Sequence, residues 1–137
     1  MQFMTQEWIE AYMEALNNNP AYEEAAATWE GDFIFVGRDD ETNDIVMAGY
    51  FDLWHGKCRA ASQIQDIESM DGITPAFVYD GKVSNWKAVL EKKLDPIQGL
   101  MTGKFKLTGN MSKVMRAVKA AQELVNTTMM IETEFPF

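Results

Sequence analysis

Residues 95–125 constrain the fold of this chain most strongly, because they carry three local structural patterns in succession. Asp95 followed by Pro96 is typical of a helix start, since the carboxylate accepts hydrogen bonds from free N–H groups and proline has none to leave unbonded. Residues 104–108 then alternate between polar and apolar, as in a strand with one buried face. Apolar residues recur at helical spacing from 111 to 125. The segment therefore predicts helix, strand and helix with one shared apolar side.

The rest of the 137-residue chain shows similar periodic patterns, which together predict one domain. Strand 33–36 is apolar on both faces and is expected in the centre of a sheet, whereas the more polar strand 58–64 is expected at an edge. A glycine after His55 suits a tight turn between strands. The remaining predicted strands are 45–54 and 76–79, and the remaining predicted helices begin at Thr5 or Gln6, at Ala21 and at Ser84, which is the expected cap.

Residues 75–125 closely resemble the C-terminal half of the sterol carrier protein type 2 family, and the N-terminal half resembles it in the order of its elements. The resemblance implies an α+β fold, in which helices pack on one face of a five-stranded, mixed, largely antiparallel sheet and enclose an apolar tunnel for lipid. The features that carry it are a strand, a helix bearing Trp86, the Asp95-Pro96 helix with Leu100 and Met101, the strand Gly103-Lys104-Phe105-Lys106-Leu107, and Gly109-Asn110-Met111 opening the last helix.

Periodicity and the family geometry together predict which apolar residues line the tunnel. The chain has ten methionines, whose flexible side chains suit either a surface that accepts several apolar shapes or the gaps of a small core. A structure in which this region is filled, with no void for an acyl chain, would contradict the prediction. The expected ligand-binding residues are Phe33, Phe35, Met47, Phe51, Phe77, Leu100, Met101, Phe105, Leu107, Met111, Val114, Met115 and Val118.

The sequence contains no constellation of residues that points to catalysis. His55 is the only histidine and sits beside a turn glycine, and Cys58 has no second histidine nearby in sequence and starts a predicted strand. The acidic segment 39–44 lacks the glycine and final glutamate of an EF-hand loop, so we expect a solvated turn there rather than a calcium site. Asp66 and Glu68 are expected to be solvated loop acids. We therefore expect no enzyme activity, no cofactor and no metal.

The formal net charge of −9 argues against binding to nucleic acid and allows at most transient contact with anionic membranes. Most basic residues lie between 82 and 119, where they are either ordinary solvated residues or a site for an anionic head group, a fatty carboxylate or a partner. The chain has no apolar run of roughly 20 residues and no secretory pattern, and its single cysteine fits a reducing compartment. We expect a cytoplasmic protein.

Three functions remain open from the sequence. The first is a non-enzymatic carrier of a fatty acyl or sterol-like lipid. The second is an enzyme on a similar α+β fold, or an accessory that handles acyl groups for a separate enzyme. The third is an interaction module, with a possible homodimer through the outer sheet face at Tyr50 and Trp54.

The C-terminal segment 127–137 is unusually apolar for a free tail. An extended chain would place Met129, Ile131, Phe135 and Phe137 mostly along one side, over the tunnel mouth or against the sheet edge. This spacing suggests a lid that yields to cargo, and a frayed terminus or a segment ordered by a neighbouring molecule is the alternative.

Overall fold

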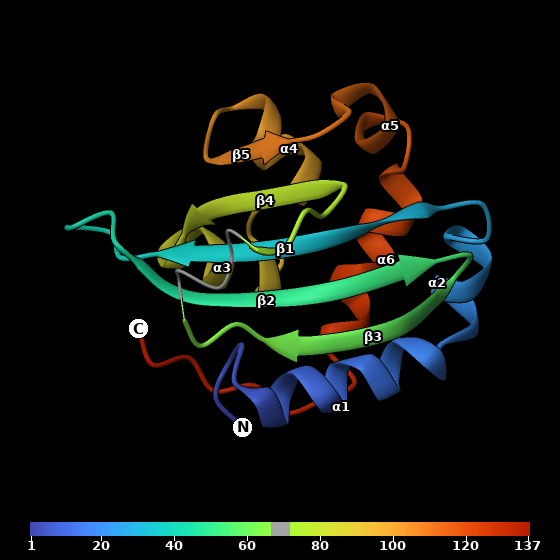
Figure 1. The fold of residues 1–137 in the computed structure, drawn as a ribbon, viewed down its shortest axis with the longest axis horizontal. Helices are drawn as coiled ribbons and strands as arrows, with labels where there is room; N and C mark the ends of the chain where they lie inside the picture. The colour runs from blue at the N-terminus through green and yellow to red at the C-terminus, as the bar shows by residue number, and fades with distance from the viewer. Residues whose placement is uncertain (67–71) are drawn as a thin grey trace.

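The computed structural model describes residues 1–66 and 72–137, and within these ranges the chain forms a five-stranded sheet with helices on one face (Figure 1). The strand order is β3-β2-β1-β4-β5, with β1 and β4 parallel and the other neighbours antiparallel. The expected α+β fold with a mixed sheet is confirmed. The strands are β1 (Glu30–Arg38), β2 (Ile45–Trp54), β3 (Lys57–Gln63), β4 (Phe77–Lys82) and β5 (Phe105–Thr108).

The central strand β1 is longer than the predicted 33–36, because neighbours on both sides satisfy its polar ends. Asp32 accepts a hydrogen bond from the Tyr50 hydroxyl at 2.8 Å, and Arg38 pairs with Asp80 of β4 at 2.9 Å. Strand β3 lies at the sheet edge, as expected. The turn before it has the predicted left-handed backbone, with φ of 48° at His55 and 79° at the glycine that follows.

The helices lie mostly behind the sheet in Figure 1, and α1 follows its lower edge beside β3. The predicted caps Asp95 and Asn110 are confirmed, since each side chain accepts backbone N–H groups of the next helix. Ser84 is not a cap. The third helix begins one residue earlier, and the carboxylate of Asp40 accepts from the Ser84 N–H at 3.2 Å. The helices are α1 (Gln6–Asn17), α2 (Pro20–Ala25), α3 (Val83–Leu90), α4 (Pro96–Met101), α5 (Met111–Met115) and α6 (Val118–Thr128).

The single closing helix predicted for 111–125 is wrong, because the chain breaks between α5 and α6. Ala117 leaves helical geometry with φ −99° and ψ 40°, and its N–H bonds to Val114 O, three residues back. The ammonium group of Lys113 holds α5 to the start of β1 by donating to the Glu30 carbonyl. The Tyr12 hydroxyl holds α6 by donating a hydrogen bond to the Leu124 carbonyl at 2.6 Å. The two helices are therefore fixed to different parts of the molecule.

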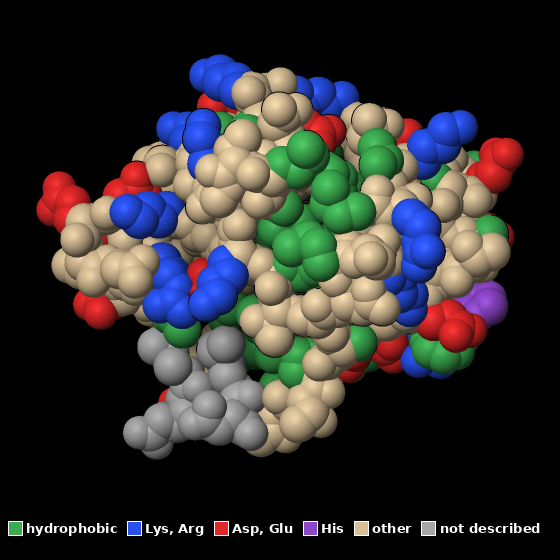
Figure 2. All heavy atoms as spheres, turned by 90° about the horizontal axis from the view of Figure 1, so that it is seen from above, with side chains coloured by type: hydrophobic (Ala, Val, Ile, Leu, Met, Phe, Trp, Pro, Cys, Tyr) green, Lys and Arg blue, Asp and Glu red, His purple; other side chains and the backbone are tan. Residues whose placement is uncertain are grey.

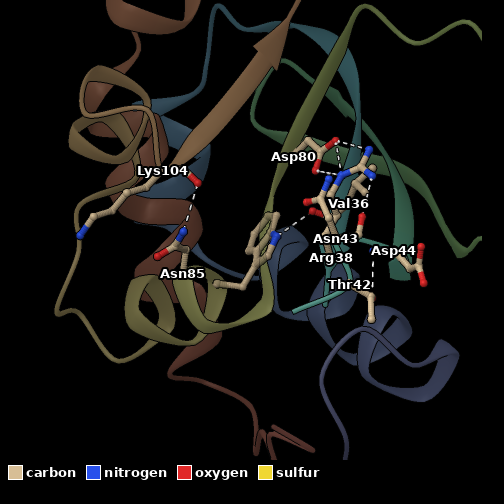
Figure 3. A network of polar contacts seen from close by, with 9 residues as sticks. Val36, Arg38, Thr42, Asn43, Asp44, Asp80, Asn85 and Lys104 are labelled. Atoms are coloured by element: carbon tan, nitrogen blue, oxygen red, sulfur yellow. Dashed lines mark hydrogen bonds and ion pairs between the residues drawn. The ribbon is translucent and has the colours of Figure 1, made fainter. Parts of the chain in front are cut away.

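Polar contacts fix α3 against the sheet, and Figure 3 shows this network. The indole of Trp86 donates to the carbonyl of Val36 at 2.8 Å, and the Asn85 amide donates to the Lys104 carbonyl at 3.2 Å. Close packing adds to these polar contacts, because the Phe105 ring occupies the space that a Cβ at Gly81 would need. These contacts hold α3 to β1 and to the residue before β5.

The two chain ends lie together at one corner of the molecule (Figure 1). Gln2 and Glu134 form a parallel bridge, in which Phe3 N–H donates to the Glu134 carbonyl at 2.9 Å. The rings of Phe3 and Phe135 are 5.9 Å apart. The C-terminal tail thus packs on the N-terminal segment rather than on a sheet edge, and the exposed side chain of Met129 takes no part.

Candidate functional site

A cavity of about 90 Å³ lies between the inner face of the sheet and the helices. A smaller hollow of about 40 Å³ adjoins it, and the two share Phe33, Val114, Ala121 and Leu124. The wall of the larger cavity is almost entirely apolar and comes from the N-terminal segment, the sheet and five of the helices in the described ranges. Its residues are Phe3, Met4, Trp8, Tyr12, Phe33, Phe35, Tyr79, Trp86, Val89, Leu90, Pro96, Ile97, Val114, Ala121, Leu124, Val125 and Thr128.

The few polar groups of this wall all hydrogen bond to the protein itself. No buried side-chain nitrogen or oxygen within residues 1–66 and 72–137 lacks a partner. A ligand in the cavity therefore meets no free donor or acceptor there. The bonds are Tyr12 Oη to Leu124 O (2.6 Å), Tyr79 Oη to Pro96 O (2.8 Å), Thr128 Oγ1 to Val125 O (2.6 Å), Trp8 Nε1 to Thr133 Oγ1 (2.8 Å) and Trp86 Nε1 to Val36 O (2.8 Å).

Burial keeps the two tyrosines of the wall in their neutral form. It raises the pKa of Tyr12 well above the ordinary value, and the neighbouring Tyr22 and Cys58 add to the effect. Burial also raises the pKa of Tyr79, and the negative charge of Asp95 adds to the shift. Both hydroxyls therefore stay protonated and keep donating to their carbonyl acceptors. Neither can act as a base at neutral pH.

The predicted ligand-binding residues divide into four groups. Phe33, Phe35 and Val114 line the cavity. The others lie outside its wall, and the family pattern gave no means of separating them. Of these, Phe51, Phe77, Leu100 and Phe105 are buried in the surrounding core, and Met47, Leu107 and Met115 are half-buried against it. Met101, Met111 and Val118 are exposed to 69%, 43% and 39%.

The exposed members of this set lie at the end of α4 and at the starts of α5 and α6, and we call them together the methionine patch (Met101, Met111 and Val118). Figure 2 shows hydrophobic side chains gathered in the middle of the face that carries β5, α4 and α5, with lysines and arginines around them. The helix break separates Met111 on α5 from Val118 on α6, whereas Met101 lies on α4. The patch lies outside the cavity rather than in it.

Apart from Val114, the prediction missed the helix side of the cavity wall. Trp8, Tyr12 and Trp86 lie on the apolar helix faces that periodicity identifies. Their large aromatic side chains were the signal that could have placed them in the wall. Phe3 and Met4 precede the first helix and carry no periodic pattern. They reach the wall because the C-terminal tail pairs with their segment.

The remaining candidate groups occupy ordinary structural positions. The His55 ring nitrogen lies 2.6 Å from a Glu30 carboxylate oxygen at the surface turn. Cys58 is buried, and burial raises the pKa of its thiol to about 12. The Asp39 carboxylate accepts two backbone N–H groups of its own hairpin, which lowers its pKa. Among the described residues no cluster of acidic, histidine and cysteine side chains could hold a metal. Glu68 lies outside the described residues.

No helix in the described part of the chain is long and apolar enough to cross a bilayer. A mixed sheet whose inner face and covering helices enclose an apolar cavity defines a small α+β binding domain. Residues 9–122 match the SCP-2 sterol transfer family, so the chain belongs to this family. The predicted resemblance is confirmed. A comparison with curated proteins found no significant match.

Solved structures agree with this assignment. A crystal structure of a sterol carrier protein 2 is 32% identical with a TM-score of 0.83, over 96% of this chain and all of the other. The solution structure of a conserved hypothetical protein from Thermus thermophilus is 33% identical with a TM-score of 0.83, over all of this chain and 94% of the other. The Aedes aegypti sterol carrier protein 2 in complex with palmitate shares the fold, at 12% identity and a TM-score of 0.56, over 93% of this chain and 98% of the other.

Proposed function

We propose that this chain binds a fatty acyl or sterol-like lipid between sheet and helices and carries it through the cytoplasm without acting on it chemically. The observation that carries the proposal is the apolar cavity whose few polar groups are already hydrogen bonded. Burial of a lipid chain there would gain about 25 cal/mol for each Å² of apolar surface removed from water. The family assignment and the palmitate complex of the Aedes aegypti relative support the same cargo class.

Lipid uptake requires the walls of the cavity to separate. A buried apolar cavity of roughly 150 Å³ holds one benzene ring, whereas this cavity measures about 90 Å³. A whole acyl chain therefore needs more space than the structure holds. We infer that α6 moves, because its wall residues Ala121, Leu124 and Val125 are only half-buried. The tunnel that the family resemblance implies would be this enlarged state.

The apolar wall sets a limit on selectivity. One methylene group changes binding by only about 1–3 kcal/mol in an apolar pocket. We therefore expect lipids that differ by one methylene group to differ in affinity by no more than about 10–200-fold. Stronger selection has to come from the polar end of the molecule.

Native mass spectrometry after gentle purification tests the proposal. The expected result is a monomer with an added lipid mass, and a stripped protein that takes up dodecanoate. A ligand-free protein that binds neither dodecanoate nor a fluorescent fatty acid would refute lipid carriage. A ligand-free dimer would favour the interaction module at Tyr50 and Trp54. Trp54 is 37% exposed there, but the Arg59 guanidinium lies 4.5 Å above its ring and covers part of it.

We also propose that the methionine patch makes transient contact with membranes during lipid exchange. Exposed apolar side chains with basic residues nearby suit an anionic bilayer surface, while the net charge of −9 shortens the contact. Met111→Ser should slow lipid transfer from anionic vesicles. Met129→Ser, which changes an exposed methionine at the end of α6, is the matched control. Equal rates for the two variants would contradict this role.

A further inference from the structure

A third space, more polar than the cavity and the smaller hollow, lies beside the cavity. It measures about 190 Å³ and lies between the turn that joins α3 to α4 and the exposed side of α6. We call it the vestibule. Its lining residues are Val89, Lys92, Leu94, Asp95, Pro96, Gln122, Val125 and Asn126.

The vestibule and the cavity are separated by side chains that both contain. Val89, Pro96 and Val125 line the two spaces. Val89 is buried and the other two are half-buried, so this partition is one side chain thick. An extended molecule that crosses it would place its chain in the apolar cavity and its end in the polar vestibule.

Free hydrogen-bond donors are present in the vestibule and absent from the cavity. The Lys92 ammonium and the Gln122 amide are exposed, and neither bonds to another residue within the described part of the chain. The one carboxylate of the vestibule, Asp95, already accepts two backbone N–H groups as the cap of α4. The next lysine in sequence differs, because it pairs with Glu91 at 3.3 Å. Among the described residues, the Lys92 charge is therefore left without a partner in the vestibule.

The backbone at Lys92 supplies an independent observation. Its φ is 61°, in the left-handed region, where it closes the end of α3. Glycine would adopt this conformation without steric cost, and a lysine pays a penalty there. Strained non-glycine residues cluster at functional sites, so this conformation at the edge of a pocket supports a role for the Lys92 side chain.

We propose that the vestibule holds the anionic head group of a single-chain lipid whose hydrocarbon chain fills the cavity. The inference rests on the proposed function and specifies the class of cargo. Lys92 contributes its charge and Gln122 a hydrogen bond to the oxygen atoms of the head group. The cavity wall, which has no free polar group, excludes the reverse orientation.

Competition against a fluorescent fatty acid at pH 8, where a carboxylate is ionised, tests the proposal. The competitors are dodecanoate, dodecyl phosphate and dodecanol, which share one chain and differ in the head group. Lys92→Gln should weaken binding of the anionic lipids by about 3–10-fold, and less at high salt, with dodecanol unchanged. Lys119→Gln, an exposed lysine of α6 outside the vestibule, is the matched control and should change none of them. Weakening of one anion alone identifies whether carboxylate or phosphate is held.

Lys92→Gly separates head-group binding from folding. It should weaken binding of the same anionic lipids as Lys92→Gln, while the Tm stays unchanged or rises by up to about 3 °C because strain is removed. Unchanged affinity for both dodecanoate and dodecyl phosphate in both variants, or equal weakening of dodecanol, would overturn the inference and leave lipid carriage intact. If the unaltered chain binds none of the three lipids, the proposed function fails, and this inference with it.

Discussion

Filling the cavity should stabilise the protein and remove its capacity for lipid. Ala121 is the best position, because its side chain lines both the cavity and the smaller hollow beside it. At roughly 24 cal/mol per Å³, an empty volume of about 90 Å³ corresponds to about 2 kcal/mol of missing packing. Ala121→Leu adds three heavy atoms to this space. Some strain offsets the gain, so we expect the free energy of unfolding to rise by about 1 kcal/mol.

The assay combines thermal unfolding of the ligand-free protein with titration of a fluorescent fatty acid. For 137 residues, a gain of about 1 kcal/mol corresponds to a Tm increase of about 3–4 °C. The same variant should bind the fatty acid at least about tenfold more weakly, since its chain loses the space it would enter. Ala21→Leu, at an exposed position in α2, is the control and should change neither quantity appreciably.

Two results would refute this reasoning in different ways. A more stable Ala121→Leu variant with unchanged fatty-acid affinity would show that the lipid binds elsewhere. A variant destabilised by more than about 1 kcal/mol would indicate overpacking, and hence that the space is not available to three added atoms. In either case the cavity would lose its place as the ligand site.

Three further changes test other parts of the structure. A chain ending at Met130, which keeps α6 whole, should release a fluorescent fatty acid faster, because Phe135 no longer packs on the N-terminal segment that lines the cavity. An unchanged release rate by stopped flow, or loss of the fold by circular dichroism, would exclude a lid. The Tm should fall as the pH rises above about 9, because the folded chain holds the pKa of the Cys58 thiol at about 12 while the unfolded thiol ionises near 9.0. Cys58→Ala should reduce this fall, and a Tm that does not change with alkaline pH would contradict the shift. Asp40→Ala should lower the free energy of unfolding by about 0.5–1 kcal/mol, since the Asp40 carboxylate accepts a hydrogen bond from the Ser84 N–H at the start of α3. An unchanged urea midpoint would show that this bond contributes nothing to stability.

The elements that could be predicted are those whose local sequence and tertiary environment agree. Strand β2 has the predicted bounds, and the helix at Asp95 begins as its cap residue indicates. Strand β4 extends beyond its apolar part to Lys82, because it pairs along β1 and β5. Ser84 was a plausible cap by residue type, but a carboxylate from a distant hairpin occupies that role. Because the hairpin is far from this helix in sequence, its carboxylate could not be identified as the partner from local patterns.

The candidate site could be predicted only in part, because a cavity depends on how two layers fit together. The alternation of Phe33 and Phe35 places both on the inner face of β1, and both line the space. Phe51 and Phe77 share that face and are buried, yet neighbouring side chains fill the room beside them. Periodicity identifies the inward face of an element. It contains no information on where the packing between faces is incomplete.

The break between α5 and α6 explains why periodicity predicts Met111 and Val118 at the cavity although both are exposed. In one straight helix Met111, Val114 and Val118 would share a stripe, so that all three would face the sheet. Arg116 and Ala117 are both good helix formers, and nothing local marks the interruption. Its cause is tertiary, because the two helices are held by separate anchors to β1 and to α1. The interruption leaves Val114 at the cavity and turns its two neighbours on the stripe towards solvent, which separates the surface that would meet a membrane from the surface that would hold the cargo.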